Sequence, residues 1–139
     1  MIDEKLLRRA IALAAEAREA GDPPFGSLLA GPDGTVLAEE RNTTITGADI
    51  SAHPELKLAV WAARELDAAT AATTTLYTSC QPCGMCAGAI ERSGLGGVVF
   101  ALSNAQLAGL KPGGGWPEVP QEGPALHEEA RVPLEGYYS

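Results

Sequence analysis

The stretch Pro82-Cys83-Gly84-Met85-Cys86 follows a short apolar run at residues 76–79 and places two thiols three positions apart. The apolar run predicts a strand. Pro82 predicts the start of a helix that continues to about residue 92, because a proline ring fits the first helical turn. Residues three apart lie on the same face of a helix. The sequence therefore predicts a strand that leads into a helix whose first turn presents Cys83 and Cys86 together.

A second stretch, His53-Pro54-Glu55, opens another predicted helix, residues 52–66. Zinc in hydrolytic enzymes keeps three protein ligands and leaves its fourth position to water, whereas a structural site has four protein ligands. His53, Cys83 and Cys86 supply three. Glu55 is then free to take the proton of the bound water and pass it on. We expect a catalytic Zn2+ ion held by these three ligands, with Glu55 as the catalytic acid and base.

Three other interpretations of the cysteines remain open. A structural zinc site needs a fourth ligand, for which Cys80 and His127 are the candidates. Neither is well placed, since Cys80 is expected to be a buried filler and His127 to be solvated between charged neighbours. A thiol redox pair is a further alternative, but it leaves His53 and Glu55 without a role. The last alternative is a zinc-stabilised binding module without catalysis.

Composition limits the class of protein. The chain has 139 residues, of which 45% are apolar and 20% charged, and this predicts a single globular domain over residues 1–139. Charged residues near the start leave no secretion signal or membrane span, so we expect a cytoplasmic protein with no membrane partner. The net charge of −8 disfavours polyphosphate ligands. We expect a small-molecule substrate and no nucleic acid.

The remaining elements follow from hydrophobic periodicity and from turn residues. Apolar residues at helical spacing predict a first helix that ends before Gly21, and a Pro-Asp-Gly turn predicts a hairpin of residues 25–30 and 35–41. A strand at 96–102 and a short helix at 103–110, capped by Ser103, come after the cysteines. A Pro- and Gly-rich loop follows at 112–124 and contains Trp116. One more short strand is expected at 130–134.

At these residues the chain resembles the cytidine deaminase superfamily, in the branch that contains guanine, cytosine and tRNA-adenosine deaminases. The resemblance includes Pro24-Phe25-Gly26, Arg41-Asn42 and residues 76–90. It implies an α/β fold, a three-layer α/β/α sandwich around a five-stranded mixed sheet, assembled as a homodimer. It also implies hydrolytic deamination of an amino-heterocycle, with Asn42 as a hydrogen-bonding substrate contact and Phe25 as a pocket-lining residue.

The departures from the family bear on the substrate. Many relatives have Ala or Gly between the His and the Glu, whose N–H contacts the base, whereas Pro54 has no N–H. Gln106 stands where guanine deaminases have an acid, and Gln81 replaces a common acidic neighbour of the zinc motif. The chain also lacks the basic tail of the tRNA-editing relatives. We therefore expect a small nucleobase or nucleoside as substrate, with tRNA adenosine deamination as the alternative.

Overall fold

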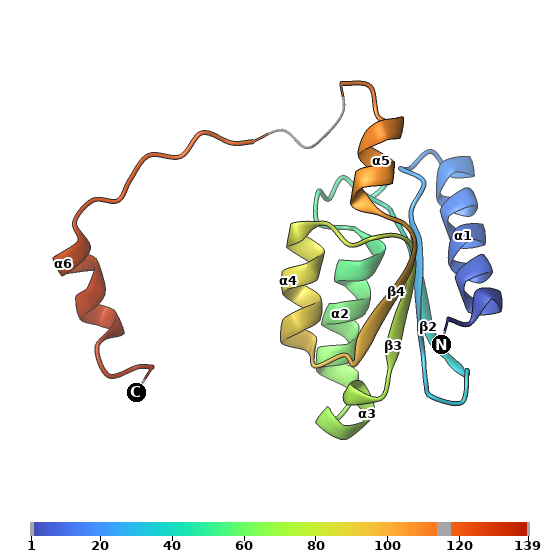
Figure 1. Ribbon diagram of the computed structural model, residues 1–139, viewed down its shortest axis with the longest axis horizontal. Coiled ribbons are helices and arrows are strands. Elements are labelled where there is room, and N and C mark those ends of the chain that lie inside the picture. The colour runs from blue at the N-terminus through green and yellow to red at the C-terminus, as the bar shows by residue number, and fades with distance from the viewer. Residues whose placement is uncertain (1, 114–117, 139) are drawn as a thin grey trace.

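Four strands form the mixed sheet in the computed structural model, which describes residues 2–113 and 118–138. Their order is β2-β1-β3-β4 (Figure 1). β1 pairs antiparallel with both β2 and β3, and β4 runs parallel to β3. The strands are β1 (Gly26–Ala30), β2 (Val36–Arg41), β3 (Thr75–Cys80) and β4 (Gly97–Leu102). The predicted hairpin and the two later predicted strands are thereby confirmed, with ends shifted by at most one residue.

Helices cover the sheet on both faces. α1 (Glu4–Glu19) lies on one face, and α2 (Pro54–Glu65) and α4 (Gly84–Ser93) lie side by side on the other (Figure 1). Because successive side chains of a strand point to opposite faces, Leu28 packs with Leu6 on the α1 side while Leu29 packs with Leu58 on the α2 side. β1 is buried along its whole length as a result. The three predicted layers are present.

Shorter helices connect and extend these layers. α3 (Ala68–Ala72), which the sequence did not predict, begins at an Asp67 cap that accepts a hydrogen bond from the Thr70 N–H. α5 (Asn104–Leu110) begins at Ser103 as predicted. Towards the C-terminus come α6 (His127–Arg131) and a 3₁₀ turn (Val132–Leu134). In the part of the chain that the structure describes, no helix has both the length and the apolar character that crossing a bilayer requires.

The expected five-stranded sheet is wrong, since the described residues form four strands and the predicted strand at 130–134 is helical. Two acidic residues in the first turn of α6 and an Arg131–Glu128 ion pair of 3.3 Å, three residues apart, favour a helix there. The segment also extends away from the sheet (Figure 1), so it has no strand to pair with. Residues 114–117 of the predicted loop, which include Trp116, lie outside the described residues.

Gly26 sets the distance between α1 and β1. A Cβ atom built at Gly26 would lie 2.5 Å from both the Ala14 nitrogen and the Leu13 Cβ. Gly26→Ala should therefore push the helix off the strand and lower the free energy of unfolding by about 1–3 kcal/mol. Urea denaturation measures this change. Gly109→Ala is the control, because nothing lies within 4 Å of its Cβ position, and an equal loss of stability in both variants would contradict the packing argument.

Candidate functional site

Two helix starts meet at the site. His53 is the N-cap of α2 and Cys83 is the N-cap of α4, and both have extended backbone conformations that turn the chain into the helix. Cys86 lies one turn further along α4 and is fully buried. Because α2 and α4 pack against each other, their first turns face the same space. The positive ends of both helix dipoles point at this space, where they favour negative charge.

The three predicted metal ligands come together. The His53 Nδ1 atom lies 3.7 Å from the Cys83 Sγ and 3.5 Å from the Cys86 Sγ, and all three donor atoms lie within 4.8 Å of one another. Zn–S bonds of about 2.3 Å and Zn–N bonds of about 2.0 Å at tetrahedral angles separate their donors by roughly 3.5–3.8 Å. The donor set and its spacing therefore fit a zinc ion with one position left open.

Glu55 lies beside these donors and is 6% exposed. Its Oε1 atom lies 3.0 Å from the Ser27 Oγ and 3.3 Å from the Thr78 Oγ1. The Thr78 hydroxyl also lies 2.9 Å from the Cys80 carbonyl oxygen, which can only accept a hydrogen bond. The Ser27 Oγ also lies 2.9 Å from the Thr78 Oγ1. When Thr78 donates to the Cys80 carbonyl, the single proton of the Ser27 hydroxyl can go to the Glu55 carboxylate, which is the stronger acceptor of the two. The two strands thus fix the position of this carboxylate.

Burial dominates the electrostatics of the site. It raises the pKa of Glu55 above the usual value, and the hydrogen bond from Ser27 offsets part of this shift. Burial, together with the neighbouring Glu55 and Cys83, also raises the pKa of the Cys86 thiol. Groups that oppose each other's ionisation in this way are stabilised as anions by a divalent cation. The chemistry of the donor set therefore fits a metal as well as its geometry does.

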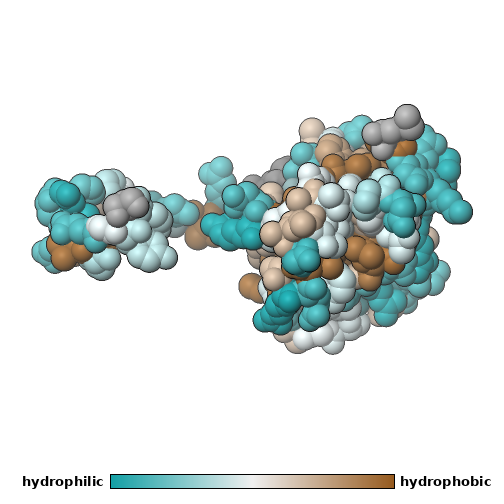
Figure 2. Space-filling model, turned by 90° about the horizontal axis from the view of Figure 1, so that it is seen from below, coloured by the Kyte–Doolittle hydropathy of each residue, from teal (hydrophilic) through white to brown (hydrophobic). Residues whose placement is uncertain are grey.

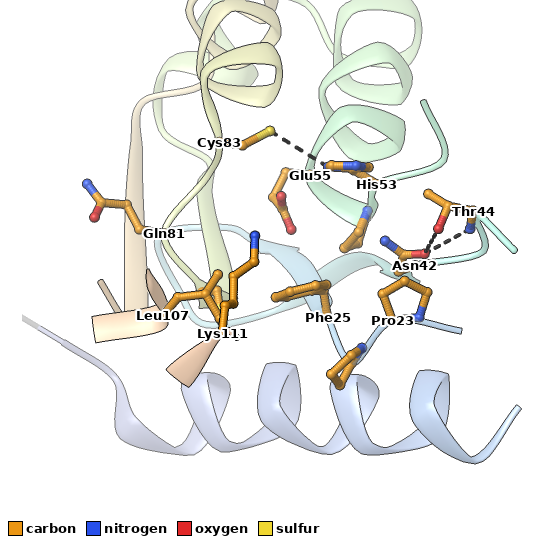
Figure 3. A pocket seen from close by; sticks show the side chains of 13 residues that line it. Pro23, Phe25, Asn42, Thr44, His53, Glu55, Gln81, Cys83, Leu107 and Lys111 are labelled. Carbon is orange, nitrogen blue, oxygen red and sulfur yellow. Dashed lines mark hydrogen bonds between the residues drawn. The ribbon is translucent and has the colours of Figure 1, made fainter. Parts of the chain in front are cut away.

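A cavity of about 370 Å³ opens next to these groups. Figure 3 shows His53, Glu55 and Cys83 on one side of it and Phe25 and Asn42 on another. The lining residues come from the two helix starts, the edge of the sheet and the end of α5. They are Pro23, Pro24, Phe25, Asn42, Thr44, His53, Pro54, Glu55, Cys80, Gln81, Cys83, Leu107 and Lys111. This volume lies within the range of small-molecule sites.

Asn42 presents a donor to this cavity. Its Oδ1 atom accepts hydrogen bonds of 2.8 Å from both the Thr44 N–H and the Thr44 hydroxyl, so its amide nitrogen remains available to a ligand. Asp22 fixes the loop that follows, because its carboxylate accepts from Ile45 and Thr46. The Thr46 N–H above all holds the pKa of Asp22 below its usual range. The predicted contact residue thus lies in the cavity with its amide oriented.

The other residues singled out from the sequence divide into two groups. Phe25 and Pro54 both line the cavity, and Pro54 offers it no N–H. Cys80, expected as a buried filler, is half-buried and lines the cavity. His127 is exposed on α6, where its ring contacts Glu128, and it does not belong to the donor cluster.

Two glutamines near the motif have structural partners. The Gln81 Oε1 accepts from the Asn104 N–H at 2.9 Å, which ties α5 to the loop before Cys83. Gln106 forms a capping box with Ser103, in which each side chain accepts from the other's backbone N–H. Gln106 is exposed and is not a lining residue of the cavity. Gln106 therefore acts as a helix cap in this structure and does not face the cavity.

Comparison with known proteins decides the family. Residues 1–102 match the family described as cytidine and deoxycytidylate deaminase zinc-binding region. The chain belongs to this family. It is a zinc-dependent hydrolytic deaminase, and its His, Cys and Cys donors with a nearby Glu agree with the established zinc chemistry of such enzymes.

Individual relatives cover most of the deaminase. A "Probable cytosine deaminase" of Schizosaccharomyces pombe is 32% identical over 155 aligned residues, which span 98% of this chain and 92% of the relative. A tRNA-specific adenosine deaminase of Haemophilus influenzae is 34% identical over 78% of this chain, a match that spans 62% of the relative. The crystal structure of guanine deaminase from Bacillus subtilis superposes with a TM-score of 0.71 at 30% identity, covering 99% of this chain and 94% of the other.

Sequence reasoning missed several residues of the site. Ser27 and Thr78 contact Glu55, while Thr44 and Lys111 line the cavity. The two hydroxyl residues sit in apolar strands, where a buried polar side chain is itself a signal, but their pairing depends on strand register. Leu107 and Lys111 are four residues apart around the predicted short helix, a spacing that places both on one face. That spacing was the available signal for Lys111.

Ser27→Ala tests the support of Glu55 by β1. The variant removes the hydroxyl that donates to the carboxylate, so the pKa of Glu55 should rise further and the rate of ammonia release should fall about 10-fold or more. Zinc content should not change, because Ser27 lies outside the donor cluster. Ser93→Ala, which removes a hydroxyl at the far end of α4, is the control. A Ser27→Ala enzyme with the full rate would contradict this role.

Proposed function

We propose that this deaminase acts on a small nucleobase or nucleoside and releases its exocyclic amine as ammonia. In this proposal His53, Cys83 and Cys86 hold the zinc ion. Glu55 is the catalytic acid and base. The observation that carries the proposal is the buried Glu55 carboxylate beside three donors at zinc spacing, all at the wall of one cavity large enough for a ring.

The chain's own groups divide the work of deamination. Zinc, when bound, supplies a Lewis acid that makes water nucleophilic near neutral pH. Glu55 takes one proton from that water and delivers it to a ring nitrogen. It then takes the second proton, from the hydroxyl that the water has added to the ring carbon, and gives it to the departing amine, which leaves as ammonia. Its raised pKa suits this exchange, because burial makes the carboxylate a stronger proton acceptor than an exposed one. Ser27 holds the carboxylate in place between the two transfers.

Asn42, Phe25 and Pro54 position the substrate in this proposal. The amide nitrogen of Asn42 donates to an acceptor on the ring edge, and the Phe25 ring packs against the base. Pro54 closes the cavity without contributing the backbone donor that Ala or Gly would offer at this position. Because that donor is missing, the orientation of the base depends on side chains.

A tRNA adenosine deaminase is the second candidate, supported by the relatives with that name. The net charge of −8 argues against it, since nucleic-acid binding requires basic residues that displace counterions. In the C-terminal segment Arg131 is paired with Glu128. Ammonia release from cytosine, cytidine, guanine, adenine, isocytosine and triazine amines, measured beside inosine formation in tRNA, separates the two candidates.

We also propose a cytoplasmic homodimer. Free cysteines, three in this chain, fit a reducing compartment in which thiols stay available to a metal.

The C-terminal segment extends away from the body of the protein and carries exposed apolar side chains (Figure 2). These are Val119, Leu126, Val132, Leu134, Tyr137 and Tyr138. A five-residue helix and a 3₁₀ turn are too short to be stable in isolation, so they need packing against other protein. In this proposal a second copy of the chain provides that packing.

Glu55→Gln and Cys86→Ser together test the catalytic assignment. Glu55→Gln should keep its zinc and lose about 10²–10⁴-fold in the rate of ammonia release, because the amide cannot carry the proton. Cys86→Ser should lose zinc and melt at a lower temperature, since metal binding contributes to folding. Elemental analysis, ammonia assays and thermal unfolding of the same samples measure these effects.

Cys80→Ser is the matched control for zinc content, because Cys80 lies outside the donor cluster. Unchanged zinc in Cys86→Ser would overturn the ligand assignment. An active Glu55→Gln enzyme would overturn the role of the carboxylate. Activity that survives chelation and follows the oxidation state of the cysteines would indicate a thiol redox protein instead.

The homodimer is tested by the mass of the protein in solution. Leu134→Asp combined with Tyr137→Asp places charges on the exposed apolar side of the C-terminal segment and should shift the dimer to a monomer in light scattering. Ile50→Asp is the control, since Ile50 is 91% exposed on a loop outside this segment. A monomeric wild-type protein at micromolar concentration would contradict the proposal.

A further inference from the structure

The position of α5 is fixed by the loop that carries the cysteines. The Asn104 N–H donates to the Gln81 Oε1 at 2.9 Å, and the Asn104 amide donates to the Pro82 carbonyl at 3.3 Å. The capping box at Ser103 holds the same first turn. These contacts anchor the start of α5 directly beside Cys83. The direction of α5, and of the side chains at its far end, is therefore set by the zinc motif.

The anchored helix presents Leu107 and Lys111 to the cavity. The two residues are four apart and line the same wall. Figure 3 shows the Lys111 side chain extending from the end of α5 toward the part of the cavity where Glu55 and Phe25 lie. Among the described residues that line the cavity, Lys111 is the one lysine or arginine. A cation thus faces a site whose other ionisable groups are thiols, an imidazole and a carboxyl.

We propose that Lys111 determines specificity by donating a hydrogen bond to an oxygen acceptor on the ring of the substrate, an oxo group or a carboxylate. The inference rests on the proposed deamination of a small amino-heterocycle. An ammonium group has three donors and no acceptor, so a contact elsewhere in the protein still leaves donors for a ligand. A ring N–H or a second amino group facing Lys111 would be repelled.

The composition of the cavity strengthens this preference. Pro54 removes a backbone donor, so an oxygen on the base needs another partner, and leaving a polar group unpaired on binding is costly. The walls next to Lys111 include the half-buried apolar side chains of Leu107 and Phe25, which make this part of the cavity less polar than bulk water. A hydrogen bond from a charged donor gains strength in such surroundings. Lys111 thus selects the substrate's acceptor edge while Glu55 works at its amine.

Matched substrate pairs test this inference in the zinc-loaded protein. Cytosine is compared with 4-aminopyrimidine, and guanine with 2-aminopurine, because each second member keeps the amine and lacks the oxo group. Lys111→Met should reduce the preference in kcat/KM for the oxo member by about 10- to 100-fold, and Lys111→Arg should keep most of it. The ratio within a pair cancels general effects of the substitution on folding or zinc content.

Binding of the deaminated products gives a second readout. Uracil and xanthine keep the oxo group, so their affinities, measured by calorimetry, should weaken by a similar factor in Lys111→Met. If the protein does not deaminate 4-aminopyrimidine or 2-aminopurine, these product affinities alone test the role of Lys111. Lys5→Met, an equal change of charge at an exposed residue of α1, should leave the preference unchanged.

Equal losses for both members of a pair, or unchanged product affinity, would overturn the role of Lys111 while leaving the proposed function intact. Failure of the wild-type protein to release ammonia from any compound of the wider panel, which also includes cytidine, adenine, isocytosine and triazine amines, would instead overturn the proposed function itself.

Discussion

The pairing register between β1 and β3 is the constraint on which the site depends. Ser27 lies directly opposite Thr78 in this ladder, and both buried hydroxyls point to the face that α2 covers, where they meet Glu55. A slip of one residue would turn Ser27 to the opposite face and put an apolar side chain under the carboxylate. The same ladder brings Phe25, which precedes β1, and Cys80, the last residue of β3, to the same end of these two strands, where both line the cavity. Register therefore positions both Glu55, the proposed proton carrier, and the residues at the mouth of the cavity.

The donor cluster could be predicted from the sequence because its parts are local. Cys83 and Cys86 share one helical turn, and His53 and Glu55 share another, so each pair is positioned by spacing alone. The partners of Glu55 could not be found in this way, since Ser27 and Thr78 are far apart in sequence and meet only through long-range strand pairing. The cavity wall formed by α5 was missed for a related reason. Its direction depends on side-chain contacts between Gln81 and Asn104 that no periodicity records.

In the C-terminal segment, the local sequence predicted a strand that the structure does not form. Residues 130–134 carry the apolar side chains that suggest a strand, yet a strand needs a neighbour with free backbone groups, and this segment extends away from the sheet (Figure 1). Local charge then determines the secondary structure of this segment, because acidic residues at the start of α6 and Arg131 near its end favour a helical turn. The number of strands in the sheet thus depends on tertiary packing, which the sequence pattern does not record. Each of the four strands within residues 26–102 could be predicted because it has its own local hydrophobic pattern.

Recognition of the base follows from how donors are distributed around the cavity. A proline at the start of α2 keeps the helix start rigid and keeps Glu55 next to the donor cluster, but it cannot offer an N–H to the ligand. The available donors come instead from the Asn42 amide, oriented by Thr44, and from the end of α5. These two donors reach the cavity from different elements, so a flat ring packed against Phe25 is oriented when it has acceptors toward both and its amine toward Glu55. A base that lacks either acceptor has more than one way to lie in the cavity, and only one of these brings its amine to the carboxylate. In the proposed function, the groups that orient the ring therefore also control whether its amine reaches Glu55, and the side-chain donors of Asn42 and Lys111 determine which rings react.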